Sequence, residues 1–340
     1  MKALVWTEPE KAEVRDVPKP EPSRGQTRVK VTYCGICGSD IGIFHGKHPR
    51  AKAPLVLGHE FIGVIDEING EAGSFAIGDR VAGWPNIPCK ECYFCKLGIP
   101  HVCKNLKITG IDLDGGAAEY VVCDTENLVR LDDSLSDTAA AIIEPLAVAV
   151  RSLHQASFKS LSTAAVLGAG PIGIMVAVML KYAGASRIII SDIDEGRLDL
   201  CRDFGFETVN AARTSLSEYV QETTNGVGAD YVFECTGTEE GSLEMSKVCR
   251  IGGLICQTGV HKMPHQVDLR DINFKEQQII GSRGHTMGEF AQAAAFAPRI
   301  QSDLEKAVTQ IVPLMESDRV FDYLSDPEMV TVKVVVDCRV

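Results

Sequence analysis

The chain has 340 residues, of which 45% are hydrophobic and 24% are charged, and its formal net charge is −12. This length is large for one hydrophobic core and predicts a globular protein of two domains. The acidic balance argues against a nucleic-acid partner, because a phosphate backbone requires a basic face. The N-terminal segment MKALVWTEPEK lacks the apolar stretch of a secretory signal, and no apolar run reaches the ~20 residues that span a bilayer. We therefore expect a cytoplasmic protein without a membrane partner.

A first set of candidate metal ligands lies early in the chain. The stretch YCGICGSDIGIFHG contains Cys37, and LVLGHEFIGVI contains His59 and Glu60. A thiolate, an imidazole and a carboxylate are the ligand types of a catalytic zinc ion that keeps one position open. Each of these residues alone is more often simple packing. Glu144 lies in the apolar run AAAIIEPLAVAV, where a carboxylate is costly unless it meets a cation. It could instead begin a helix before Pro145.

A cysteine cluster follows in residues 85–104, PNIPCKECYFCKLGIPHVCK. The spacing C-x2-C-x2-C-x7-C is formed by Cys89, Cys92, Cys95 and Cys103. A reducing compartment argues against a disulfide knot. The last gap is longer than in bacterial ferredoxins and no proline follows the fourth cysteine, which disfavours an iron–sulfur cluster. We therefore predict a closed, structural zinc site. Most of the other cysteines lie in apolar surroundings and are expected to be small buried side chains.

A dinucleotide-binding pattern begins at residue 161. A buried strand is followed by Gly168, Gly170 and Gly173, which form G-x-G-x-x-G with Pro171 and Ile172 at the start of an apolar helix. The glycines permit a tight turn, close approach of a pyrophosphate and close packing of helix on strand. The phosphates would bind at the helix N-terminus. The pattern also explains the apolar run 164–180 as half strand and half helix.

The acidic residue expected in this pattern is Asp192, which follows the second strand. Its carboxylate would bind an unmodified ribose and repel a 2′-phosphate, so the sequence predicts NAD over NADP. Arg197 is the nearby residue that could accommodate such a phosphate. The alternative for Asp192 is a strand-end or helix-capping role.

Three further apolar strands, at 228–237, 252–260 and 277–284, end in glycine-bearing loops. Ligands of doubly wound sheets bind beyond the carboxyl ends of the strands, although ordinary loop chemistry is an equal alternative. The candidate cofactor residues there are Cys235, Thr236, Thr258, Gly259, Val260, Ser282 and Arg283. The C-terminal segment VTVKVVVD, residues 330–337, is expected to be a strand of an internal or an intersubunit sheet.

Together these features resemble the zinc-dependent medium-chain dehydrogenase/reductase (alcohol dehydrogenase) superfamily, with the sorbitol and polyol dehydrogenase branch as the most similar part. The resemblance covers the whole chain and rests on CGICGSD, GHE, the four-cysteine lobe, GDRV, DGGAAEY, EPLAV and GAGPIG in the family's order. It implies an α/β protein with a GroES-like, β-rich catalytic domain at 1–145 and a zinc lobe at about 85–105. A Rossmann domain with a doubly wound parallel sheet would occupy 146–290, and residues 291–340 would return to the catalytic domain. A homo-oligomer, tetramer or dimer, is also implied.

The resemblance also implies roles for individual residues. Cys37 and His59 match the catalytic zinc ligands, and the four cysteines of the lobe match the structural zinc site. Glu60 matches a carboxylate that binds the metal directly or moves in during turnover, and Glu144 matches one that binds directly or through water. Asp40 matches an acid that orients the zinc-bound histidine.

The expected proton path begins at Ser39, which matches the hydroxyl that hydrogen-bonds the substrate alcohol. Many relatives carry a histidine at the position of Gly42, so the chain departs from the pattern there. Either His45 or water is expected to take the proton instead.

The implied function is zinc-dependent, NAD(P)-linked oxidation of a secondary alcohol on a polyol, sugar or sugar acid to the ketone by hydride transfer. A threonine- or butanediol-type dehydrogenase is the alternative within the family. A zinc-free reductase of the quinone oxidoreductase kind and a nucleotide-binding protein with structural zinc and no turnover are the rival classes. Metal analysis separates the first rival, and turnover separates the second.

Overall fold

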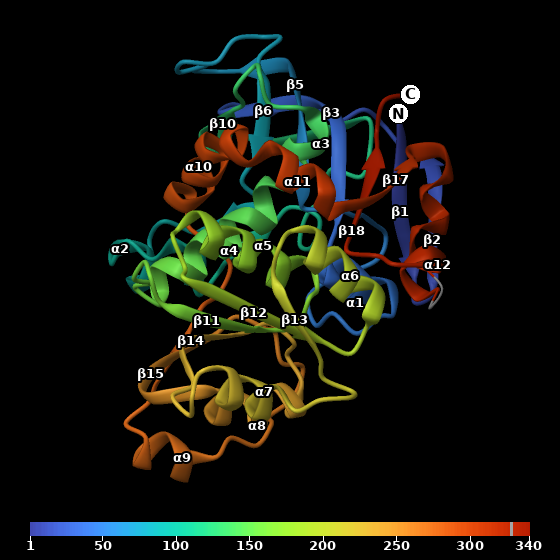
Figure 1. Cartoon of the computed structure of the whole chain (residues 1–340). Helices are drawn as coiled ribbons and strands as arrows, with labels where there is room; N and C mark the ends of the chain where they lie inside the picture. Colours follow the sequence, from blue (N-terminus) through green and yellow to red (C-terminus); the bar gives the residue numbers. More distant parts are fainter. Residues whose placement is uncertain (327–328) are drawn as a thin grey trace. The chain divides into compact units, whose positions relative to one another are not determined.

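The computed structural model describes residues 1–326 and 329–340 (Figure 1). The chain divides into two compact units: Met1–Glu144 together with Thr286–Val340, and Pro145–His285. Within the described ranges, no helix combines the length and apolar character needed to cross a membrane.

The first unit is built around a mixed sheet with the strand order β10-β6-β5-β3-β18-β17, in which β9 also pairs with β3. Only the β17–β18 pair of this sheet is parallel among the described strands. The strands are β3 (Gln26–Ile36), β5 (Glu60–Asn69), β6 (Arg80–Gly83), β9 (Tyr120–Asp124), β10 (Leu128–Arg130), β17 (Val308–Pro313) and β18 (Lys333–Asp337). A second sheet, β2-β1-β4, contains β1 (Lys2–Glu8), β2 (Lys11–Asp16) and β4 (Leu55–Val56), and β7 (Asn86–Ile87) pairs with β8 (Lys107–Ile108).

The C-terminal strand β18 is internal to this sheet. It pairs in parallel with β17 on one side and antiparallel with β3 on the other. Val334, Val335 and Val336 are fully buried, as expected for a central strand covered on both faces. Of the two sheets expected for this segment, the structure shows the internal one.

Short helices connect and cover the strands of the first unit. They are α1 (Gly38–Phe44), α2 (Tyr93–Lys96), α3 (Asp137–Ala140), α10 (Met287–Phe296), α11 (Gln301–Ala307), α12 (Val320–Ser325) and the 3₁₀ helices η1 (Pro100–Val102), η2 (Thr125–Asn127), η3 (Ala297–Ile300) and η4 (Leu314–Arg319). The helix α4 (Ile143–Gln155) contains the boundary between the units, at Glu144 and Pro145.

The second unit is a doubly wound domain with the parallel strand order β13-β12-β11-β14-β15-β16. Figure 1 shows α5 and α6 on one face of this sheet and α7 and α8 on the other. The strands are β11 (Thr163–Leu167), β12 (Arg187–Asp192), β13 (Glu207–Asn210), β14 (Ala229–Glu234), β15 (Cys249–Gln257) and β16 (Gln278–Gly281). The helices are α5 (Pro171–Tyr182), α6 (Glu195–Asp203), α7 (Leu216–Thr223), α8 (Glu239–Val248) and α9 (Leu269–Phe274).

Continuous burial along the strands shows that both faces of this sheet are covered. Leu216, Val220 and Met245 of α7 and α8 pack with one set of strand residues, among them Val232. The strand β11 is Thr-Ala-Ala-Val-Leu and is buried from its second residue, so its other face must be covered as well. The strand order reverses between β11 and β14, which places the carboxyl ends of these two strands at the point where such sheets bind ligands.

Candidate active site

The helix α1 places Cys37 and Asp40 at the start of the candidate site. Cys37 is the N-cap of α1, and its N–H donates to Asp40 Oδ2 at 2.8 Å. The other carboxylate oxygen of Asp40 accepts the N–H of Gly58 at 3.2 Å. Because Asp40 is fully buried, these bonds fix the helix start to the residue that precedes His59.

A three-residue group forms the first candidate metal site. The ligand atoms of Cys37, His59 and Glu60 lie within 4.8 Å of one another, and His59 and Glu60 are buried. Burial alone would lower the pKa of His59, but the charges of Cys37 and Asp40 raise it well above its usual value. A site in which anionic side chains surround an imidazole attracts a cation, so this donor set fits zinc.

Asp40 lies near this histidine without a hydrogen bond to it. His59 Nδ1 is 3.9 Å from Asp40 Oδ2 and has no hydrogen-bond partner among the described residues. At this distance the carboxylate acts on the imidazole through its charge, and its role in orienting the histidine stays a prediction.

Glu144 lies outside the three-residue group. No ligand atom of Glu144 belongs to the set that lies within 4.8 Å, among the described residues. Its charge nevertheless contributes to the raised pKa of His59. A role for Glu144 as a zinc ligand stays a prediction.

Lys333 is a residue of this site that the sequence analysis missed. It forms an ion pair with Glu60, and 2% and 1% of the two side chains are exposed. Burial raises the pKa of Glu60. The positive charge of Lys333 lowers this pKa, and the negative charge of Glu144 raises it further. A lysine within the otherwise apolar run VTVKVVVD was the sequence signal that could have found it.

Ser39 and its surroundings form the expected start of the proton path. The Ser39 hydroxyl is buried and has no hydrogen-bond partner among the described residues. His45 Nδ1 lies 2.7 Å from Glu10 Oε1, so this histidine already has a partner. The Gly42 carbonyl oxygen accepts the N–H of Lys47 and His48, and a Cβ on Gly42 would meet nothing within 4 Å. The position of the family's histidine is therefore open space.

The four cysteines of the lobe form the second candidate metal site. Their sulfur atoms lie within 4.8 Å of one another, with separations of 3.4 Å (Cys89–Cys103), 3.5 Å (Cys92–Cys95) and 3.8 Å (Cys92–Cys103). Four sulfurs at ~2.3 Å from one zinc ion are separated by about 3.8 Å, so the cage has nearly the required size. All twelve cysteines of the chain are free.

Backbone groups of the lobe favour thiolates. Hydrogen bonds from the N–H groups of Cys95 and Lys104 lower the pKa of Cys92 to about 6. Hydrogen bonds from Glu91 and Cys92 likewise lower the pKa of Cys89. Burial and its neighbouring cysteines raise the pKa of Cys95 to about 12, because closely spaced thiols cannot all ionise without a cation. This is the chemistry of a metal cage.

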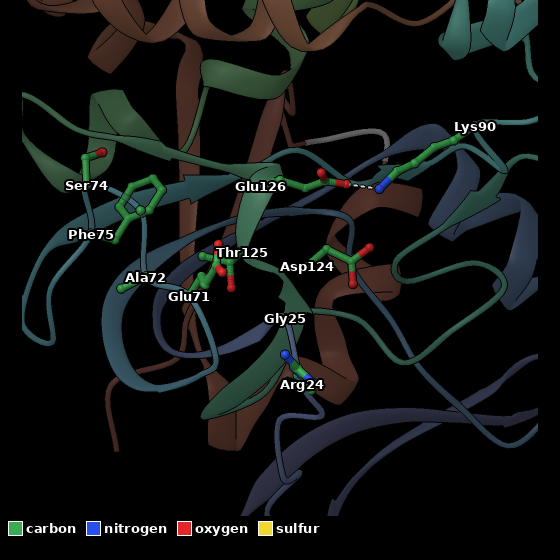
Figure 2. A pocket seen from close by; sticks show the side chains of 11 residues that line it. Arg24, Gly25, Glu71, Ala72, Ser74, Phe75, Lys90, Asp124, Thr125 and Glu126 are labelled. Atoms are coloured by element: carbon green, nitrogen blue, oxygen red, sulfur yellow. Dashed lines mark hydrogen bonds and ion pairs between the residues drawn. The ribbon is translucent and has the colours of Figure 1, made fainter.

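An open hollow of about 590 Å³ lies beside this lobe. Figure 2 shows the ion pair between Glu126 and Lys90, the residue that follows the first cysteine; both side chains line the hollow. Arg24, Glu71 and Asp124 add charges of both signs to its wall. None of its lining residues belongs to either candidate metal group. Both side chains of this ion pair are mostly exposed, so the pair contributes little to holding the lobe in place.

The glycine loop of the second unit has the geometry expected for binding phosphates. Gly168 has a φ of 97°, and Gly170 is the N-cap of α5. A Cβ on Gly173 would collide with the Gly168 carbonyl oxygen, so only glycine allows the helix this close to the strand. A Cβ on Gly170 would point into open space, where a dinucleotide can approach the backbone. The loop therefore fits the pyrophosphate of a dinucleotide cofactor.

Asp192 lies beside this loop at the end of β12. Its Oδ2 accepts the N–H of Ala169 at 2.7 Å, and its Oδ1 accepts the N–H of Asp194 at 3.0 Å. Arg197 Nε lies 3.8 Å from the Asp194 carboxylate. The loop and the acidic residue are thus held together by backbone hydrogen bonds.

The remaining predicted cofactor residues follow β14, β15 and β16, at the carboxyl edge of the sheet. Some of their polar groups are engaged within the protein. The hydroxyls of Thr258 and Ser282 lie 3.1 and 3.3 Å from that of Ser152, and the backbone N–H and hydroxyl of Thr236 bind Glu234. Cys235 and Gly259 are partly buried, whereas Val260 and Arg283 are exposed.

Comparisons with known proteins agree with this arrangement. Residues 23–133 match the alcohol dehydrogenase GroES-like domain, and residues 171–299 match the zinc-binding dehydrogenase domain. The chain is 31% identical to the 2-dehydro-3-deoxy-L-galactonate 5-dehydrogenase of Pseudoalteromonas atlantica, over 94% of this chain and 93% of that protein. It is 32% identical to the sorbitol dehydrogenase of Halalkalibacterium halodurans, over 98% of both. A zinc-binding dehydrogenase of Sinorhizobium meliloti 1021, solved with NADP bound, is 30% identical, with a TM-score of 0.91 and coverage of 99% and 98%.

The fold and the two donor sets define a nicotinamide-dependent oxidoreductase that uses zinc. The chain belongs to the zinc-dependent medium-chain dehydrogenase/reductase (alcohol dehydrogenase) superfamily. The predicted family, the α/β fold class, the enzyme class and the need for zinc and a nicotinamide cofactor are confirmed. The similarity to dehydrogenases favours an enzyme over the rival class of nucleotide-binding proteins without turnover.

Proposed function

We propose that the enzyme oxidises a secondary alcohol on a polyol, sugar or sugar acid to the ketone, with NAD as the hydride acceptor. The observation that carries this proposal is the group of Cys37, His59 and Glu60 within 4.8 Å of one another. Two of the similar proteins act on sorbitol and on a sugar acid, which supports this substrate class.

The residues of the first unit have separate roles in this proposal. Cys37 and His59 would hold the catalytic zinc ion, with Asp40 stabilising the imidazole through its charge. When bound, zinc supplies Lewis acidity toward the alcohol oxygen, and the nicotinamide ring supplies the hydride acceptor. Ser39 would accept the hydroxyl proton of the substrate, because its buried Oγ has no partner among the described residues.

The proton would leave Ser39 through water. Gly42 has no side chain to carry it, and the space that a side chain would occupy is open. His45 is paired with Glu10 and would not take part. The lobe cysteines Cys89, Cys92, Cys95 and Cys103 would hold a structural zinc ion with no open position.

The preference for NAD would come from Asp192. Its carboxylate is fixed beside the glycine loop, where it can accept hydrogen bonds from ribose hydroxyls and repel a 2′-phosphate. Arg197 is directed in part toward Asp194 and would offer less to such a phosphate.

We also propose that the enzyme is a homo-oligomer that includes a dimer through β16. Among the described strands β16 pairs only with β15, so its other edge carries free backbone groups. Ile279 of this strand is exposed, and Phe274 of the neighbouring α9 is 80% exposed. A two-fold dimer would pair the edge with its own copy. Sedimentation of an Ile279→Lys variant as a smaller species than the unmodified enzyme is the expected result, and an unchanged size would count against this interface.

The experiment that tests the activity is a screen of NAD⁺ reduction over polyols, sugar acids, amino alcohols and simple diols. We expect turnover of a polyol or sugar acid, and its loss in a folded Cys37→Ser variant. Turnover confined to amino alcohols or diols would replace the substrate class by that of the threonine- or butanediol-type enzymes. Wild-type turnover by Cys37→Ser would contradict the assignment of the active site.

A further inference from the structure

The segment that follows α1 turns back onto this helix and carries His48. Gly46 has a φ of 65°, in the left-handed region, which reverses the chain. The Gly42 carbonyl oxygen then accepts the N–H groups of Lys47 and His48, at 2.8 and 3.1 Å. Gly42 and Ser39 are three residues apart on α1 and therefore lie on one face of the helix. The backbone of His48 is thus fixed to the helical turn that follows the Ser39 hydroxyl.

The imidazole of His48 is held in one orientation by backbone groups. Its Nδ1 accepts the N–H of Ala51 at 3.3 Å and the N–H of Arg50 at 3.4 Å. A ring nitrogen that accepts a hydrogen bond carries no proton, so the neutral ring carries its proton on Nε2. None of the residues that the structure describes hydrogen-bonds this Nε2. The partly buried His48 therefore presents one N–H donor without a partner in the protein.

The surroundings of His48 favour the neutral ring. Burial and the neighbouring charge of Arg50 lower the pKa of this histidine. The charges of Asp112 and Asp40 raise the pKa, and the charge of His59 lowers it. Asp40 and His59 belong to the candidate active site, so His48 lies within electrostatic range of that site. A neutral imidazole with its proton on Nε2 can donate to a substrate oxygen, but this nitrogen cannot take up a proton.

Arg50 anchors the other end of the segment. Its Nη1 donates to the Leu106 carbonyl oxygen at 2.6 Å and lies 3.3 Å from Asp112 Oδ2. The carboxylate of Asp112 also accepts the N–H of Ile108 at 2.8 Å, which fixes the acid itself. The segment is therefore tied to α1 on one side of His48 and to residues 106–112 on the other. A donor that is held in place before the substrate arrives loses little entropy on binding.

We propose that His48 determines substrate specificity by donating its Nε2–H to an oxygen atom that the substrate carries beside the alcohol being oxidised. This inference rests on the proposed function, since it takes the Cys37/His59 group as the place where the alcohol binds. A fixed donor that the substrate shields from water discriminates against any substrate that cannot accept its hydrogen bond, because the donor is then left unpaired. Polyols and sugar acids carry such an oxygen, as a hydroxyl or a carboxylate, and simple secondary alcohols do not.

The test compares sorbitol, gluconate and 2-butanol as substrates of the full-length zinc enzyme, since 2-butanol has no second oxygen. The fastest polyol or sugar acid of the NAD⁺ screen takes the place of sorbitol and gluconate if it exceeds both. In His48→Leu we expect kcat/KM for the preferred polyol or sugar acid to fall by about 10–100-fold, and kcat/KM for 2-butanol by less than about threefold. If turnover of 2-butanol is too slow to measure, its inhibition constant against the preferred substrate replaces kcat/KM.

Two further substitutions of His48 separate the hydrogen bond from packing. His48→Gln carries an N–H group at a similar distance from the backbone and should keep kcat/KM for the preferred substrate within about fivefold of the unmodified enzyme. His48→Asn, whose amide is shorter, should behave like His48→Leu and serves if that variant does not fold. A larger loss with gluconate than with sorbitol assigns a carboxylate as the partner of His48, and the reverse assigns a hydroxyl.

His45→Asn is the matched control, because His45 lies in the same segment but its Nδ1 is 2.7 Å from Glu10 Oε1. This variant should change none of the three values. Equal losses with all three substrates in His48→Leu, or no loss with the preferred one, would overturn this inference alone. An unmodified enzyme that turns over no polyol or sugar acid would overturn the proposed function as well.

Discussion

The Asp40 carboxylate lies 3.9 Å from His59 Nδ1, and both of its oxygens accept backbone N–H groups, from Cys37 and Gly58. One buried acid therefore fixes the chain on both sides of the candidate metal site and places a negative charge beside the imidazole. The arrangement links the N-terminus of α1 to the segment that carries the histidine.

We predict that Asp40→Asn weakens zinc binding at the Cys37/His59 site by roughly 10–100-fold, the range found when partners of metal ligands are replaced. The amide has one acceptor oxygen, so it can serve only one of the two N–H groups, and it carries no charge. Competition with a chelator measures the affinity. Asp114→Asn is the matched control, because Asp114 also accepts a backbone N–H, from Val56 at 3.0 Å, and is outside the metal group. Equal affinity in Asp40→Asn and the unmodified enzyme would contradict the prediction.

The four-cysteine lobe gives a second prediction. Replacing the buried Cys103 by serine should reduce the zinc content from two ions to one and lower the unfolding free energy by about 4 kcal/mol, near the upper end for single substitutions. Residual activity per folded molecule should persist, because this site has no open position. Elemental analysis and denaturant unfolding check both effects.

The control for the lobe is Cys123→Ser, which also replaces a buried, free thiol but lies outside the metal groups. It should cost about 1–3 kcal/mol through the buried hydroxyl while both zinc ions remain. Two zinc ions in Cys103→Ser would contradict the assignment of Cys103 as a zinc ligand. Loss of turnover with normal stability would show that the two sites had been assigned the wrong way round.

The sequence predicted best those features that depend on residues close together in the chain. The spacing of the cysteines and glycines shows which sulfurs and backbone groups can meet, and the structure brings the four sulfurs together and packs Gly173 on Gly168. The pairing of Glu60 with Lys333 depends on β5, β3 and β18 being neighbours in the sheet. The pattern of residues within one strand does not predict which strands are neighbours. The distance between Asp40 and His59 and the position of Glu144 outside the ligand group are likewise set by tertiary packing.

A third prediction concerns the cofactor. Asp192→Asn should lower kcat/KM with NAD by about 10–100-fold, the effect of losing one hydrogen bond to a charged group. It should lower kcat/KM with NADP by a smaller factor. The ratio of the two values is the readout. Asp230→Asn is the control, because the Asp230 carboxylate also accepts a backbone N–H, from Thr163 at 2.8 Å, but lies at the amino-terminal start of β14, so this variant should leave the ratio unchanged. A ratio that is unchanged in Asp192→Asn would assign this residue to structure alone.

The last prediction concerns stability and pH, at a pair remote from the metal ligands. Arg28 Nε donates to Asp66 Oδ2 at 2.6 Å, and the arginine side chain is 9% exposed. Burial alone would raise the pKa of Asp66, but the hydrogen bonds from Arg28 and Lys19 lower it below the usual 3.8. A carboxyl with a lowered pKa in the folded state stabilises the fold above its unfolded pKa, and this contribution is lost as the pH falls through the folded value. Asp66→Asn should therefore destabilise the enzyme by about 1–3 kcal/mol at pH 7, with a deficit that shrinks below about pH 4.

Denaturant unfolding at pH 7 and at about pH 3 measures this difference. Asp16→Asn is the control, because the Asp16 carboxylate also pairs with a lysine, Lys2, at 2.8 Å, but 76% of its side chain is exposed. Exposed ion pairs contribute little, so this variant should match the unmodified enzyme at both pH values. A deficit in Asp66→Asn that is as large at pH 3 as at pH 7 would show that the ion pair is not its source and that the substitution acts through packing of the buried arginine against Tyr120.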